Sequence, residues 1–581
     1  MGQDHLAVII RRVAERLFSA TDTVCLERAR LVTEAYGEHE GLPAPLLRAR
    51  AFEHLLSHTS IDVESNPVIA GNTSSAPRAW MLVPEFGLGV DRQIELEHPA
   101  LEGFLDGEIS KEIEGFWLGK SFGGNAGIGH LSVDFDLVVN RGLGAVLRDI
   151  DAAEDGRLGE EGVYRAAMAE SCRAVIGWAH RIADAAEHAA RQADGRALAN
   201  GRALAAAHRR VADACRWVPE RPARDLFEGL QAMAIVHSAT VLEGQGLSVS
   251  IGLPDRVLAR FAPQLGRADD SWDEAVCHVS AFLLRVASNS YHGRGSKTQA
   301  ITIGGRYAGR GADASNSITE LFLEAFDRTP VNDPHLFVRR HRTLSDAVWH
   351  RAMEMLASGR SMPMIVNDDA VIPGLIDAGV SESDAADYCI IGCNELGIPG
   401  RACQSGFSLH SGFNDLELID QSLRALVARA VRTGGDDTDA TVGRAEVTAQ
   451  AVLSEYEARV SRTIDEGVQK RRARIEQHVR NRPFPFTTAC CTDCAAVGKD
   501  LLVGMRYPEI YGVFIRGTTN AVNVLSALEY SNDRRADRLA ALLSSIDADS
   551  FDALDAACRA VPRWGSDDPR ADRLGRALCE A

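Results

Sequence analysis

The run Asp387-Tyr-Cys-Ile-Ile-Gly-Cys-Asn-Glu-Leu-Gly397 places a cysteine and a glutamate directly after a short apolar segment. The apolar residues 389–391 predict a short buried strand, and the glycine after them ends it. Cys393 and Glu395 follow with one residue between them, so the thiol and the carboxylate can point the same way. Strand ends flanked by glycines are where α/β proteins place chemistry. The alternative is a buried cysteine and a surface glutamate in an ordinary turn.

Further landmarks occur in a fixed order along the chain. They are Ile69-Ala-Gly-Asn72, Gly129-His130 with Asp134-Phe135, Gly359-Arg-Ser-Met-Pro-Met-Ile-Val-Asn-Asp368, Ile372-Pro-Gly-Leu375, Gly379-Val-Ser-Glu-Ser-Asp-Ala-Ala-Asp-Tyr388, Asp493-Cys494 and Trp564-Gly-Ser-Asp-Asp568. In this order the chain resembles the glycyl radical enzymes, the pyruvate formate-lyase-like superfamily. Asn394 and Leu396 depart from the valine and proline of that family's motif, which leaves the reaction type and the substrate open.

The predicted fold is an α/β barrel. Long amphipathic helical patterns, such as residues 164–191 and 440–479, alternate with short apolar runs at residues 247–251, 300–303, 336–338, 364–366 and 389–391. The resemblance implies a ten-stranded barrel surrounded by helices, with the cysteine loop inside it. We expect one barrel domain over residues 1–581, with 1–115 mainly helical and 116–581 forming the barrel core and peripheral helices.

Two chemistries are open to the Cys393 thiol. A nucleophilic thiolate needs a basic neighbour, and no basic residue precedes Arg401 in this stretch, although a distant histidine could fold in. A thiyl radical instead takes a hydrogen atom from a C–H bond and needs a dry cavity. The resemblance implies this second chemistry, used for elimination by cleavage of a C–O, C–N or C–S bond, or for decarboxylation. The expected substrate is a small polar molecule.

The resemblance also implies roles for individual residues. Glu395 is the candidate base that deprotonates a substrate hydroxyl, and His130 is the candidate proton donor to the leaving group. Gln404, Phe407 and His410 occupy the segment that varies with substrate in the family, so they are candidate substrate contacts.

The glycyl half of such a site is missing from the 581 residues. Family members carry an Arg-Val-x-Gly-Tyr element whose glycine holds the radical, and no Gly-Tyr pair occurs in this sequence. We therefore expect no cofactor bound directly to the chain. A small glycyl-radical subunit would supply the radical in trans, and a radical S-adenosylmethionine activase would install it. The alternatives are a non-radical homologue that binds a ligand and a scaffold protein.

Composition limits the remaining possibilities. The formal net charge of −18 argues against nucleic acid as a general partner. No apolar stretch approaches twenty residues and the start lacks a signal peptide, so we expect a cytoplasmic protein with no membrane partner. The twelve cysteines are too sparse for a disulfide scaffold, and the cluster Cys490, Cys491 and Cys494 lacks a second ligand group, so no metal site is predicted. A homodimer is possible from sequence.

Overall fold

The described residues of the computed structural model form two compact units. The first comprises residues 1–405 and 477–511, and the second comprises residues 406–476 and 512–581. The structure describes residues 3–21, 23–86, 95, 102–104, 106–120, 129–153, 159–194, 201–245, 248–266, 270–289, 299–309, 311–403, 412–433, 447–510, 512–513, 515–530, 559 and 561–580. The expectation of a single barrel domain over residues 1–581 stays a prediction.

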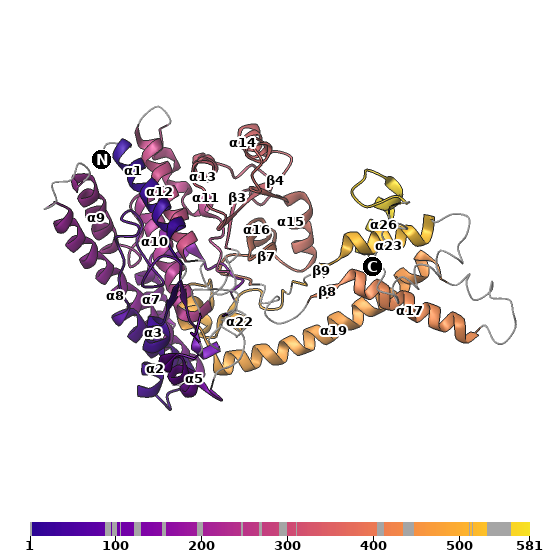
Figure 1. The fold of residues 1–581 in the computed structure, drawn as a ribbon, viewed down its shortest axis with the longest axis horizontal. Helices are drawn as coiled ribbons and strands as arrows, with labels where there is room; N and C mark the ends of the chain where they lie inside the picture. Colours follow the sequence, from indigo (N-terminus) through magenta and orange to yellow (C-terminus); the bar gives the residue numbers. More distant parts are fainter. Residues whose placement is uncertain are drawn as a thin grey trace. The chain divides into compact units, whose positions relative to one another are not determined.

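Helices make up most of the first unit (Figure 1). They are α1 (Gln3–Ser19), α2 (Glu27–Glu38), α3 (Ala44–His58), α5 (Glu108–Trp117), α6 (Phe135–Asn140), α7 (Leu143–Ala152), α8 (Glu160–Asp194), α9 (Gly201–Cys215), α10 (Leu226–Thr240), α11 (Pro254–Val257), α12 (Asp270–Ser288), α13 (Ser317–Arg328), α14 (Asp346–Ala357), α15 (Asp368–Asp377), α16 (Glu382–Ala386), α20 (Pro485–Ala489), α21 (Cys494–Val497) and α22 (Leu501–Gly504). Short helical turns are η1 (Pro84–Phe86), η3 (Val241–Gln245) and η4 (Ala259–Gln264).

Two of these helices show why the sequence forms a helical wall. The buried face of α8 is rich in alanine, and small side chains let α8 approach both α3 and α9 closely. Helix α10 is buried along its whole length, and its buried polar side chains Gln231 and His237 contact the backbone carbonyls of Ala70 and Val249. Its first turn is capped by Asp225, whose side chain accepts a hydrogen bond from the Glu228 amide.

Parallel strands adjoin this wall. The strands β3 (Ala300–Gly304), β4 (His335–Arg340) and β5 (Met364–Asn367) form one parallel sheet, joined by crossovers through α13 and α14. A parallel bridge between Gly252 and Ile301 joins the segment around Gly252 to β3. A second parallel bridge, between Leu131 and Val249, joins the segment around Leu131 to that neighbour. Every residue of β3 is buried, as predicted for the short strands of an α/β core, whereas β5 has no buried residue and its Ile365 is 38% exposed. A smaller parallel pair joins β1 (Thr23–Cys25) to β2 (Ala79–Met81).

A hairpin lies against β3. It consists of β6 (Cys389–Ile391) and β7 (Glu395–Gly397), which pair antiparallel around a three-residue turn. Successive side chains of β6 point to opposite faces, so Ile390 joins the cluster around Phe337, whereas Ile391 packs with Leu253. The Ile390 amide donates to Thr302, and the Gly392 amide donates to Ser250, which also accepts from Ala300 at the start of β3. The chain of β6 therefore runs opposite to β3, and the turn lies toward the N-terminal end of β3.

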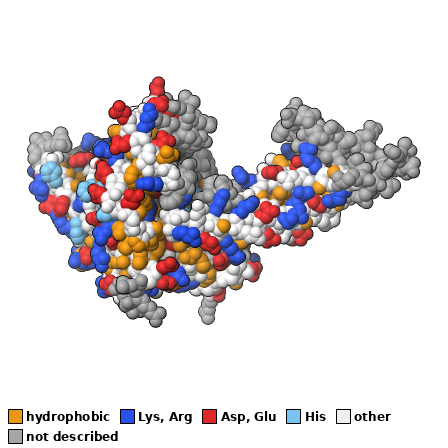
Figure 2. Space-filling view, turned by 90° about the horizontal axis from the view of Figure 1, so that it is seen from below, with side chains coloured by type: hydrophobic (Ala, Val, Ile, Leu, Met, Phe, Trp, Pro, Cys, Tyr) orange, Lys and Arg blue, Asp and Glu red, His pale blue; other side chains and the backbone are white. Residues whose placement is uncertain are grey.

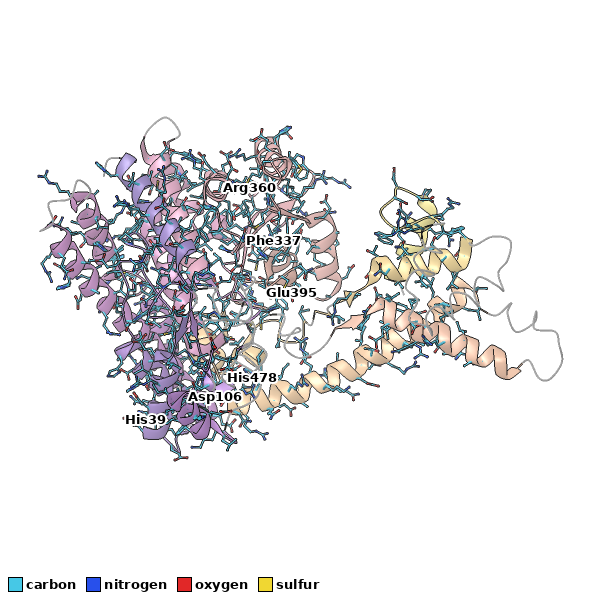
Figure 3. The ribbon with its side chains drawn as sticks, in the orientation of Figure 1. His39, Asp106, Phe337, Arg360, Glu395 and His478 are labelled. Atoms are coloured by element: carbon cyan, nitrogen blue, oxygen red, sulfur yellow. The ribbon has the colours of Figure 1, made fainter. Side chains whose placement is uncertain are left out.

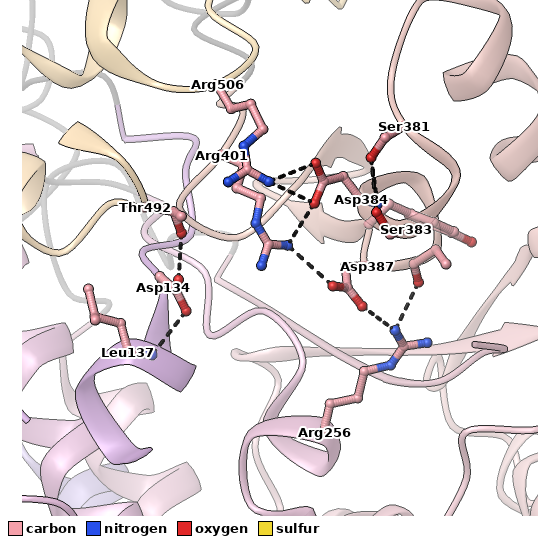
Figure 4. A network of polar contacts seen from close by, with 12 residues as sticks. Asp134, Leu137, Arg256, Ser381, Ser383, Asp384, Asp387, Arg401, Thr492 and Arg506 are labelled. Carbon is pink, nitrogen blue, oxygen red and sulfur yellow. Dashed lines mark hydrogen bonds and ion pairs between the residues drawn. The ribbon is translucent and has the colours of Figure 1, made fainter. Parts of the chain in front are cut away.

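Charged groups hold the base of this hairpin (Figure 4). Asp387 accepts from Arg256 at 2.6 Å and from Arg401 at 3.2 Å. Asp384 in turn pairs with Arg401 and Arg506. Because one carboxylate is shared by two guanidinium groups, the segments before β6 and after β7 are tied to each other and to α11.

The second unit is mainly helical. It contains α17 (Asp415–Thr433), α23 (Thr518–Tyr530), α26 (Pro569–Glu580) and the pair β8 (Phe413–Asn414) with β9 (Ile515–Arg516). Helix α19 (Ala449–Asn481) crosses the boundary between the units. Asp415 organises the core of the second unit, because its carboxylate accepts from the Tyr456 hydroxyl at 2.6 Å and from the Thr518 hydroxyl at 2.6 Å.

Two further observations concern the described residues as a set. None of the described helices is both long and apolar enough to cross a membrane. On the face drawn in Figure 2, acidic and basic side chains are intermingled, with apolar side chains between them.

Candidate functional site

Cys393 lies at the tip of the hairpin turn, directly after β6. Its side chain is exposed, whereas the preceding Ile391 and Gly392 are buried. The strand predicted at residues 389–391 is present and packs against β3, but it continues into a hairpin that the sequence did not predict, and the Cys393 thiol is exposed. The reason is local, since the turn residues Cys393 and Asn394 project beyond the last pair of the β6–β7 ladder.

His130 and Glu395 form a close pair beside this turn. The His130 Nδ1 and Glu395 Oε1 atoms are 2.9 Å apart, and the two side chains are only 10% and 9% exposed. His130 immediately precedes Leu131, which bridges to Val249, and Glu395 is the first residue of β7 (Figure 3). The distance is that of an ion pair, although the two groups are not aligned as in an ideal hydrogen bond.

The surroundings keep Glu395 ionised. Burial alone raises the pKa of this carboxyl, but the contact with His130 and the backbone amide of Asn394 outweigh it, so the pKa is lowered overall. The Asn394 amide donates to Glu395 Oε2 at 3.1 Å. Glu395 is consequently a carboxylate at neutral pH, in the form that accepts a proton.

Gly392 makes this close approach possible. Its backbone adopts a φ of +57°, which glycine tolerates best. A Cβ atom at this position would lie 2.6 Å from His130 Nδ1 and 2.8 Å from Glu395 Oε2. The glycine before the thiol is therefore required for two reasons, namely the turn conformation and the space taken by the His130–Glu395 pair.

The predicted site residues divide into two groups. Cys393 and Glu395 belong to the hairpin, and His130, more than 260 residues earlier in the chain, contacts Glu395 beside the turn. Gln404, Phe407 and His410 lie outside the described residues, so their role stays a prediction. The described part of the chain holds no cluster of three or more potential metal ligands.

Two residues near the turn were not singled out from the sequence. The hydroxyls of Ser250 and Thr302 accept hydrogen bonds from the backbone of the hairpin. The only available signal was a polar residue inside each of two apolar strand patterns, which is too common to be specific.

Comparison with known proteins identifies the family. Residues 8–581 match the model of the pyruvate formate lyase-like family. The chain belongs to this family, which confirms the resemblance seen in the landmark order.

Characterised relatives are distant and longer. The chain is 26% identical over 457 residues to the isethionate sulfite-lyase of Oleidesulfovibrio alaskensis, covering 67% of this chain and 54% of that protein. It is 23% identical over 551 residues to the (2S)-3-sulfopropanediol dehydratase of Klebsiella oxytoca, covering 85% and 65%. These matches thus span less than two thirds of either relative.

Solved structures support the predicted fold. The glycerol-bound B12-independent glycerol dehydratase from Clostridium butyricum superimposes with a TM-score of 0.81 at 22% identity, covering 99% of this chain and 78% of that one. A glycyl radical enzyme from Archaeoglobus fulgidus gives 0.74 at 21%, covering 99% and 79%. At this identity the likeness shows the fold, and the barrel prediction is confirmed.

Proposed function

We propose that this chain is the barrel subunit of a glycyl radical lyase that removes a leaving group from a small hydroxylated substrate. The observation that carries the proposal is the convergence of an accessible Cys393 thiol, an ionised Glu395 and His130 at one turn. A carboxylate with a lowered pKa beside a histidine can accept a proton and stay linked to a second titratable group.

In the proposed reaction each of these residues has one role. When present, the glycyl radical supplies the hydrogen-atom acceptor that turns the Cys393 thiol into a thiyl radical. The thiyl sulfur takes a hydrogen atom from the substrate carbon that bears a hydroxyl, forming an S–H bond. Glu395 takes the hydroxyl proton, and the neighbouring carbon–heteroatom bond breaks with its electron pair on the leaving group. His130 donates a proton to that group, and the product radical recovers a hydrogen atom from Cys393.

The names of two relatives support a proposal for the class of substrate. Their names describe a sulfite-lyase and a dehydratase, which expel sulfite and water respectively. We propose that this chain cleaves a C–O, C–S or C–N bond next to a hydroxyl, with decarboxylation as the alternative within the same family.

The radical is proposed to come in trans. The Cys393 thiol is exposed rather than enclosed. A thiyl radical needs protection from water and oxygen, so a glycyl-bearing subunit that covers the turn would supply both the radical and the seal. A radical S-adenosylmethionine activase would install the radical, and the cytoplasm of an anaerobic cell suits this chemistry.

The test is coexpression of the chain with its glycyl-bearing subunit and activase, without oxygen. The activated complex should show a doublet electron paramagnetic resonance signal and turnover. Glu395→Gln should lower kcat by about 100-fold or more, because the amide keeps the volume and loses the base. Cys393→Ala should keep the radical signal and lose turnover, because the thiol acts after the glycyl radical.

The matched control is Cys579→Ala, which removes another exposed thiol and should leave turnover unchanged. Full activity of the isolated chain in air would rule out the trans-radical proposal. Ligand binding without any radical signal in the activated mixture would favour a non-radical homologue.

A further inference from the structure

Two side-chain hydroxyls hold the hairpin that carries Cys393. They accept hydrogen bonds from the free edge of β6, where a neighbouring strand would supply backbone carbonyls. Alternate N–H groups of a strand point to opposite edges, and one edge of β6 faces β7. On the opposite edge, the Ile390 amide donates to Thr302 Oγ1 at 2.9 Å and the Gly392 amide donates to Ser250 Oγ at 3.2 Å. The hairpin is thus fixed at two points, two residues apart, without joining the parallel sheet.

The hydroxyl of Ser250 has its full set of hydrogen bonds. It accepts from the Gly392 amide and from the Ala300 amide at 3.1 Å, and it donates to the Ser248 carbonyl at 3.3 Å. A hydroxyl offers one donor and two acceptor sites, so none is spare. Ser250 is completely buried, so shortening its side chain leaves two buried amides without the hydroxyl that they bind.

The peptide bound by Ser250 is the one that places the thiol. Gly392 precedes Cys393, and its Cα approaches the His130–Glu395 pair closely enough that a Cβ would overlap both. Ser250 therefore binds the amide of Gly392, and the His130–Glu395 pair limits the movement of Gly392 toward it. A shift of this peptide changes the distance from the sulfur to the base.

We infer that Ser250 is a positioning residue that sets the location of Cys393 relative to Glu395 and His130. Thr302 fixes the same strand two residues earlier. The inference rests on the proposed function for the meaning of that location, but the location itself can be measured on the isolated chain.

The test compares Ser250→Ala with Ser238→Ala. Ser238 is equally buried and hydrogen-bonded, to Gly71 and Asn289, so it controls for loss of a buried hydroxyl elsewhere. Hydrogen–deuterium exchange at the Gly392 amide should accelerate about tenfold or more in Ser250→Ala and stay unchanged in Ser238→Ala. The rate of Cys393 alkylation by iodoacetamide should change only in Ser250→Ala, and Ser250→Thr should restore both readouts.

Activity of the assembled enzyme provides a second readout. In the activated complex, Ser250→Ala should keep the radical signal and KM while kcat falls about tenfold or more, because a misplaced reacting atom affects the chemical step. If the wild-type complex is inactive, the proposed function fails, yet the exchange and alkylation results still decide the role of Ser250.

Two results would overturn the inference. One is unchanged exchange at Gly392 and unchanged alkylation in Ser250→Ala, even if its unfolding midpoint drops as in the control. If the Ser250→Ala chain does not fold, Thr302→Val is measured instead. Unchanged exchange at the Ile390 amide in Thr302→Val would contradict the role of the hydroxyls in holding the hairpin.

Discussion

At the scale of single residues, the departures from the family motif have small structural effects. Asn394 is exposed, and its backbone amide, which any residue other than proline would supply, donates to Glu395. Leu396 lies in β7, pairs with Ile390 of β6 and packs against the cluster around Phe337. It therefore belongs to a strand rather than to a turn. In the proposed function the chemistry depends on Cys393, Glu395 and His130, and Gly392 leaves the space that the His130–Glu395 pair occupies.

Gly392→Ala tests the requirement for that glycine. The left-handed backbone costs a residue with a side chain about 1–2 kcal/mol, and the overlap with His130 and Glu395 adds about 1–3 kcal/mol. Gly309 is the matched control, because its φ is +78° and no atom lies within 4 Å of an added Cβ. Denaturant unfolding should show a larger loss of stability for Gly392→Ala than for Gly309→Ala. Equal losses would mean that the pair is not held against Gly392.

At the scale of elements, a buried ion pair connects the parallel sheet to the hairpin. Arg339 of β4 and Asp368 at the start of α15 are both fully buried and bond through two N–H groups at 2.8 and 2.9 Å. Arg339 also donates to the carbonyls of Ala386 and Tyr388, and the Tyr388 hydroxyl donates to Asp368 at 2.7 Å. Asp368 and Tyr388 are two of the landmarks in the sequence, and their contact explains why both are needed to hold the segment before β6.

Arg339→Met measures the strength of this connection. Removing one partner leaves a buried uncompensated carboxylate, so the free energy of unfolding should fall by about 3–5 kcal/mol. Arg340→Met alters the next residue of β4, which is exposed, and should cost less than about 1 kcal/mol. Denaturant titration of both variants gives the comparison, and similar values for the two would show that the buried pair is energetically unimportant.

At the scale of the whole molecule, buried histidines make stability depend on pH. His237 is completely buried, where its Nε2 lies 3.0 Å from the Val249 carbonyl, and burial lowers its pKa from 6.5 to about 4. His478 is half-buried, and desolvation together with the nearby Arg482 and Arg48 lowers its pKa to about 3. Both side chains are therefore neutral in the folded protein and charged in the unfolded chain at mildly acidic pH.

The sign of the effect follows from proton counts. Between pH 6.5 and 4 the unfolded chain binds the proton of His237 and the folded protein does not, so stability is complete above pH 6.5 and falls as the pH decreases. This one histidine should contribute a loss of about 3 kcal/mol across that range. His237→Gln should flatten the acid limb of an unfolding-versus-pH curve, whereas the exposed His350→Gln should not. An unchanged acid limb in His237→Gln would contradict the neutral buried state.

The family, the α/β class and the strand 389–391 could be predicted from the sequence, because they depend on local apolar patterns and on landmark order. The role of the Cys393 thiol stays a prediction. The sequence also indicated His130 and Glu395 as candidate partners. The folded chain adds three facts: these two side chains meet at 2.9 Å, a side chain at position 392 would overlap both of them, and the hydroxyls of Ser250 and Thr302 bind the backbone of the hairpin. Such contacts join residues more than 80 positions apart, and their geometry depends on how the strands stagger and which way the hairpin runs. Local propensity contains no information about either.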